Sequence, residues 1–166
     1  MKQVDQPSAA ALSEHIRSLL PNSWLPAIYC NQILKLRTRA YHFGRLPRNA
    51  GVEIQHTLLG VELKVGRRRF LCPDLATARY LSVFARAGCE DVAVPYDITQ
   101  ISTLADALES SWQRMLLLVE HEIPNAALRT RTRGLLVAKL RSEISTAGAG
   151  REIPEFKQNT RQRRSS

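Results

Sequence analysis

The stretch GVELKVGRRRF, residues 60–70, places a glutamate and a lysine two positions apart in an apolar alternation and then runs into three arginines. Neighbouring side chains of an extended strand point to opposite faces, so Glu62 and Lys64 would project together from one face. Carboxylates can hold Mg²⁺ or Mn²⁺, and a lysine beside them can neutralise charge on a phosphodiester that is being cleaved. Glu53 is the nearest acid in the sequence that could supply a second carboxylate.

With these residues in place, the stretch from 51 to 96 resembles the PD-(D/E)xK nuclease superfamily, most nearly its Holliday-junction-resolvase-like branch. The matching pieces are the acid in GVEIQ, the Glu-x-Lys in VELK, the basic strand RRRFLC, the helix DLATARYLSVFARAG and the strand DVAVP. The resemblance implies that Glu53 and Glu62 bind the metal and that Lys64 is the catalytic lysine. It implies a metal-dependent endonuclease or phosphodiesterase with Mg²⁺ or Mn²⁺ as its cofactor.

An ordinary β-hairpin explains the same residues without any chemistry. A strand with one solvent face often carries Glu and Lys on that face, and Glu62 would then pair with Arg67 or Arg69 for about 0.2–1 kcal/mol. The residues VGRR have the glycine and polar side chains of a tight turn. The sequence leaves both interpretations open.

Positive charge is concentrated in two zones of the chain. Residues 35–69 carry nine Lys or Arg against two acids, which gives +7, and residues 129–166 carry ten against three, again +7. Residues 70–128 carry three against eight, which gives −5, and the whole chain carries +9. Such a distribution favours a polyanionic partner, with nucleic acid as the first candidate and an acidic protein as the alternative.

Arginines near turns and along one predicted helix are the candidate phosphate contacts, because a guanidinium can fork onto phosphate oxygens. The candidates are Arg45, Arg48, Arg67, Arg68, Arg69, Arg129 and Arg133. His42 and His56 flank the first basic zone and can change charge near neutral pH. Neither stands in the spacing of a nucleophile or metal site, so we expect surface or packing roles for them.

Apolar periodicity predicts the elements that position these residues. Helices are expected over 8–20, after Pro26, over 74–88, over 102–121 and over 124–144, and short strands over 52–54, 59–65, 68–72 and 91–96. The strand–helix–strand order at the end of the 51–96 segment predicts a right-handed parallel crossover.

The predicted fold class is α/β (α+β): a small mixed sheet of three antiparallel strands and one parallel strand, packed by helices. We expect a flexible lead over 1–7 and a single globular domain over 8–146. Within that domain, residues 8–48 would be helical and residues 51–96 would form the β-β-β-α-β core. Residues 102–144 would form two helices that pair with each other or with those of a second subunit in a homodimer. Residues 147–166 are expected to form a disordered basic tail.

Cysteine usage and hydropathy predict the cellular environment of the protein. Cys30, Cys72 and Cys89 are odd in number and lie in apolar neighbourhoods, which predicts reduced, buried thiols. No stretch reaches the roughly 18 apolar residues of a membrane span, and the first 20 residues lack the apolar run of a secretory leader. We therefore expect a soluble, cytoplasmic protein without a membrane partner.

Overall fold

The computed structural model describes residues 7–47 and 50–150, which form helices and two small antiparallel sheets. The helices are α1 (Ala9–Ser18), α2 (Leu25–Ile28) with the π turn η1 (Tyr29–Ile33), α3 (Leu75–Ala87), α4 (Ile98–Glu122) and α5 (Ala126–Ala147). The strands are β1 (Thr38–His42), β2 (Val52–Thr57), β3 (Gly60–Val65), β4 (Arg68–Cys72) and β5 (Asp91–Pro95). The α+β class predicted from the sequence is confirmed.

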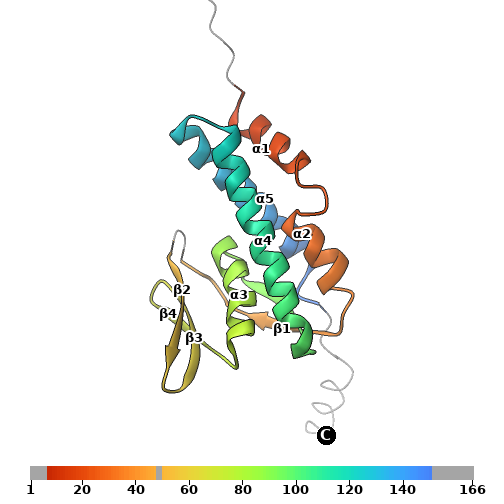
Figure 1. Cartoon of the computed structure of the whole chain (residues 1–166), viewed down its shortest axis with the longest axis vertical. Helices are drawn as coiled ribbons and strands as arrows, with labels where there is room; N and C mark the ends of the chain where they lie inside the picture. Colours follow the sequence, from red (N-terminus) through yellow and green to blue (C-terminus); the bar gives the residue numbers. More distant parts are fainter. Residues whose placement is uncertain (1–6, 48–49, 151–166) are drawn as a thin grey trace, which may run out of the picture.

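Helix α3 is the central element, with the three-stranded sheet on one side and α4 on the other (Figure 1). Its ends are set by the residues that the sequence predicted. The Asp74 carboxylate accepts a hydrogen bond from the Thr77 N–H at 2.7 Å, and Gly88 closes the helix in the left-handed conformation at φ 77°. Tyr80, Val83 and Phe84 are buried, so the helix brings its apolar face into one continuous core.

Strands β2, β3 and β4 form the expected antiparallel sheet in that order. Two-residue turns connect them, at Leu58 and Leu59 and at Gly66 and Arg67. One face buries Leu63 and Val65, and the other face carries the polar residues. The tight turn predicted at VGRR is therefore confirmed.

The predicted parallel pairing of the strand over 91–96 is wrong. Strand β5 belongs to a separate sheet, where it pairs antiparallel with β1 from Thr38 opposite Pro95 to His42 opposite Asp91. The expectation that 8–48 is helical throughout is wrong for the same reason, because β1 lies inside that range.

Two tyrosine hydroxyls occupy the other edge of β5. The Ala93 N–H donates to the Tyr29 hydroxyl at 2.9 Å, and the Ala93 carbonyl accepts from the Tyr80 hydroxyl at 2.6 Å. Both backbone groups therefore point away from β1 and are already satisfied, which leaves no hydrogen-bonding edge for a parallel neighbour.

The two long helices lie along the length of the molecule (Figure 1). Helix α4 begins four residues before the predicted start, where the Asp97 carboxylate accepts from the Thr99 N–H. The two helices touch, but α4 packs mainly on α3, and α5 packs mainly on α1. The expected pairing of α4 with α5 is thus a minor contact within this chain.

The ends of the described region qualify two further expectations. Gly148, in the segment expected to be disordered, accepts a hydrogen bond from the Tyr29 hydroxyl at 2.5 Å, while residues 1–6 and 151–166 lie outside the described residues.

Cys72 and Cys89 are buried as predicted, but Cys30 is exposed. Within the described part of the chain, no helix has the length and apolar character needed to cross a membrane.

Candidate functional site

The three predicted catalytic residues share one face of the small sheet. Glu53 stands opposite Lys64 in the register of β2 and β3, and Glu62 stands opposite Gln55, so all of these side chains lie on the polar face. This agrees with the geometry expected of a Glu-x-Lys strand, although VELK lies on the second of the three antiparallel strands.

The two carboxylates have different surroundings, and one Glu62 oxygen is buried without a hydrogen-bond partner among the described residues. Glu53 accepts a hydrogen bond from the Gln55 amide at 3.3 Å, and a Glu62 oxygen faces the Arg69 guanidinium at 3.9 Å. Nowhere in residues 7–47 and 50–150 do three or more His, Cys, Asp or Glu side chains form a group that could hold a metal ion. The Glu62–Arg69 contact is the cross-strand pair of the ordinary hairpin, and catalytic roles for Glu53, Glu62 and Lys64 stay a prediction.

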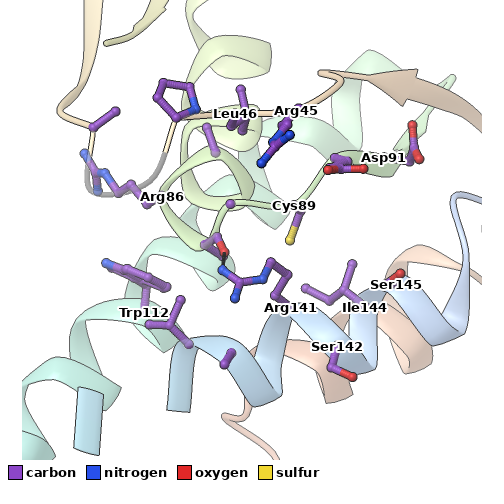
Figure 2. A pocket seen from close by; sticks show the side chains of 18 of the residues that line it. Arg45, Leu46, Arg86, Cys89, Asp91, Trp112, Arg141, Ser142, Ile144 and Ser145 are labelled. Atoms are coloured by element: carbon purple, nitrogen blue, oxygen red, sulfur yellow. Dashed lines mark hydrogen bonds between the residues drawn. The ribbon is translucent and has the colours of Figure 1, made fainter. Parts of the chain in front are cut away.

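A cleft lies between the segment after β1, the end of α3 and the face of α5. This cleft, about 1280 Å³ in volume, is lined by four arginines from three segments that are distant in the sequence: Arg45, Arg86, Arg133 and Arg141. We call it the arginine cleft. Figure 2 shows Arg45 and Arg141 on opposite sides of it, with Cys89 between them and Asp91 beside Arg45.

A second, smaller hollow of about 560 Å³ adjoins the arginine cleft. It is lined by Arg45, Leu46, Pro47, Gly66, Arg67 and Arg68, and we call it the hairpin hollow. The two share Arg45, Leu46 and Pro47, so positive side chains continue from the β3–β4 turn into the arginine cleft. Arg68 is held in place by the Phe70 ring, 4.8 Å from its guanidinium carbon, and by donating to the Arg45 carbonyl at 3.0 Å.

Among the described residues, the arginines of the two hollows have no acidic partner, in contrast to Arg79 and Lys139. Arg79 bonds both Asp106 and Glu109, at 2.5 and 2.7 Å, and Lys139 bonds Glu14 at 2.9 Å. No carboxylate of the described residues lies within 4.0 Å of the arginines of the two hollows. Arg141 instead donates to the Ala87 carbonyl at the end of α3, at 3.1 Å.

The structure thus sorts the predicted phosphate contacts into those it gathers and those it does not. Arg45, Arg67, Arg68 and Arg133 line the joined hollows. Arg69 lies on the opposite face of the sheet beside Glu62, Arg129 bonds the chain that follows α4, and Arg48 falls outside the described residues. Alternation along β4 puts Arg68 on the face opposite Glu62 and Lys64, so the hollows and the predicted catalytic face lie on different sides of the sheet.

Two arginines of the cleft were not among the predicted contacts. Arg141 lies two helical turns after Arg133 on α5, with Val137 between them, and this spacing was a usable signal. Arg86 comes from the acidic middle of the chain, and only the fold brings it to the cleft.

Besides its arginines, hydroxyl side chains and Trp112, the cleft is lined by a histidine, two acids and a cysteine. His42 and Asp91 are cross-strand neighbours whose side chains contact each other, Nδ1 to Oδ1, and Glu90 precedes Asp91 on the rim. Burial raises the pKa of the Cys89 thiol to about 12, against the opposing effect of Arg141, so this thiol is no nucleophile at neutral pH.

Comparison with protein-family models, curated proteins and solved structures finds no match for this chain.

Proposed function

We propose that this protein binds nucleic acid, with the sugar-phosphate backbone lying along the arginine cleft and the hairpin hollow. The observation that carries the proposal is the gathering of arginines without acidic partners, from β1–β2, α3 and α5, around two joined hollows. Guanidinium groups left unpaired beside one another repel, and a polyanion relieves that repulsion and releases its own counterions on binding.

Arginine chemistry favours phosphate as the anion. A guanidinium presents several N–H donors in one plane and can bond two oxygens of a phosphate at once. A polymer with a charge on every residue can also engage both hollows together, since they meet at Arg45, Leu46 and Pro47. Contacts of this kind set affinity without reading base sequence.

The test compares two double variants that remove the same charge. Arg86→Ala with Arg133→Ala changes the arginine cleft, whereas Arg114→Ala with Arg131→Ala removes two exposed arginines that do not line it. Fluorescence anisotropy with labelled single-stranded and duplex oligonucleotides should show that the first pair weakens binding by about tenfold or more, since a hydrogen bond to a charged group contributes roughly 1.5–3 kcal/mol. The second pair should change it far less. Equal losses in both pairs would mean that net charge alone attracts the polymer, and the proposal would fail.

A competition experiment separates nucleic acid from an acidic protein partner. Polyglutamate of matched charge should displace a labelled oligonucleotide only weakly, because single carboxylates on flexible side chains fit the fixed guanidinium groups less well than a phosphodiester backbone does. Displacement by polyglutamate at the same charge concentration as by unlabelled oligonucleotide would favour the acidic-protein alternative.

Substitution of Glu62 tests the nuclease interpretation directly. Because Glu62 lies on the face opposite the hollows, we expect Glu62→Ala to leave oligonucleotide affinity unchanged, and we expect wild-type protein with Mg²⁺ or Mn²⁺ to leave the oligonucleotide intact. Denaturing gels of labelled oligonucleotides, incubated with each ion, provide the measurement. Metal-dependent cleavage that disappears in Glu62→Ala would assign the active site to Glu53, Glu62 and Lys64 after all.

A further inference from the structure

His42 and Asp91 form a titratable pair on the wall of the arginine cleft. They stand opposite each other at the end of the β1–β5 ladder, and the His42 Nδ1 contacts an Asp91 carboxylate oxygen. Their side chains are 66% and 52% exposed, so both exchange protons and ions with the solvent that fills the cleft. The pair is the one place on the cleft wall where a histidine, whose charge changes between about pH 5 and 8, meets a carboxylate.

Charged groups from every neighbouring element act on His42. Among the charged side chains that line the same cleft, Asp91 on β5 and Glu90 just before it favour the imidazolium, whereas Arg45 after β1, Arg86 on α3, and Arg133 and Arg141 on α5 oppose it. An anion bound among these arginines shifts the balance, because its charge offsets theirs and attracts the imidazolium. With neutral His42 and ionised Asp91 the pair carries one negative charge, and protonation of His42 makes the pair neutral.

We propose that proton uptake by His42 strengthens nucleic-acid binding in the arginine cleft, which makes the affinity pH-dependent. This inference rests on the proposed function and specifies how the same site is regulated. Linkage requires the effect to be reciprocal: if a bound phosphate favours protonated His42, protonation of His42 must favour the bound phosphate by the same factor. The sign follows directly, with tighter binding as the pH falls through the range in which histidine gains its proton.

The expected size comes from the same relation. We expect about a tenfold change in dissociation constant, which linkage equates with a proton held about tenfold more tightly in the complex than in the free protein. Carboxylates and arginines elsewhere keep their charge across this interval. The other groups that could make binding depend on pH are therefore the remaining histidines and the α-amino group.

Three substitutions isolate His42. His42→Asn keeps a side chain that can donate to Asp91 but cannot take up a proton, so its affinity should stay at the level that wild type shows near pH 8. His42→Arg carries a permanent charge and should stay near the acidic level across the range. His56→Asn, on β2 and away from both hollows, is the matched control and should keep the wild-type pH dependence.

The measurement is the dissociation constant of oligothymidine and oligouridine, whose bases do not titrate here, between about pH 5.5 and 8 at constant ionic strength. Circular dichroism at each pH confirms that the variants are folded. Binding that keeps its full pH dependence in His42→Asn, or has none in wild type, overturns the inference while leaving the proposed function standing. Absence of binding at every pH overturns both.

Discussion

Arg129 and Arg133 lie one helical turn apart on α5 and have different surroundings. Arg129 donates to the carbonyls of Ile123 and Pro124, at 3.1 and 3.2 Å, and so satisfies backbone groups where the chain leaves α4. Arg133 is exposed on the wall of the arginine cleft and has no carboxylate within 4.0 Å among the described residues. Adjacent positions on one stripe of the helix therefore contact the backbone in one case and line the arginine cleft in the other.

Alanine substitution should separate these roles. We expect Arg129→Ala to lower the free energy of unfolding by about 1 kcal/mol, the value of a typical hydrogen bond, and to leave oligonucleotide affinity unchanged. Arg133→Ala should leave stability unchanged and reduce the slope of log affinity against log salt by about one. Urea denaturation and a salt titration check the two halves. A weaker affinity in Arg129→Ala with an intact Arg133 would mean that the cleft extends further along α5 than its lining residues indicate.

At the scale of elements, two tyrosine hydroxyls satisfy the Ala93 backbone groups on the edge of β5 that faces away from β1. Burial raises the pKa of Tyr29 to about 12 from an ordinary 10.0, and burial also places the pKa of Tyr80 well above 10.0. Below pH 10 both phenols are protonated in folded and unfolded chains alike. Between about pH 10 and 12 the unfolded chain loses these protons and the folded chain keeps them, so stability falls as the pH rises through this window.

Tyr29→Phe should show this contribution. The variant should be less stable at neutral pH by about 1–3 kcal/mol, because the Ala93 N–H and the Gly148 carbonyl lose their partner. It should also lose less stability than wild type between about pH 10 and 12, where a shift of two pKa units corresponds to about 2–3 kcal/mol. Urea denaturation at several pH values gives both numbers, with Tyr96→Phe, at a half-exposed position, as the control. Parallel pH profiles for wild type and Tyr29→Phe would contradict the argument.

Elements with strong local signals were predictable from the sequence. Helix α3 has a capping aspartate, a helical apolar stripe and a terminal glycine, so its bounds follow from residues within one segment. Strand β1 has no such signal: in TRAYH the residues Ala40 and Tyr41 are both partly buried, and alternation is weak. The partner of β5 was equally hidden, because the choice depends on the hydroxyls of Tyr29 and Tyr80, which come from different segments of the chain.

At the scale of the whole molecule, binding should depend steeply on salt. If about four arginines neutralise phosphates, affinity for duplex DNA should fall by about a hundredfold between roughly 50 and 200 mM monovalent salt. Anisotropy titrations in sodium or potassium chloride measure this slope. A flat profile would show that the contact is apolar and would contradict binding through the arginines.

The candidate site was partly predictable at this scale. The two basic zones, 35–69 and 129–166, do meet in the fold, since Arg45 comes from the first and Arg133 and Arg141 from the second. The hollows themselves were not predictable, because they depend on how the segment after β1 lies against α3 and α5. Linear charge patterns therefore predicted a polyanionic partner, which stays a prediction, and only the fold shows which arginines line the cleft.

The packing of α1 on α5, together with the Tyr29–Gly148 hydrogen bond, joins segments 119 residues apart. A ribosome makes α1 before α5, so the apolar face of α1, with Ile16 fully buried in the folded protein, lacks this partner until α5 has been made. Contacts of such long range also slow the search for the native state. We therefore expect the apolar face of α1 to be open to chaperones during synthesis until α5 emerges and covers it.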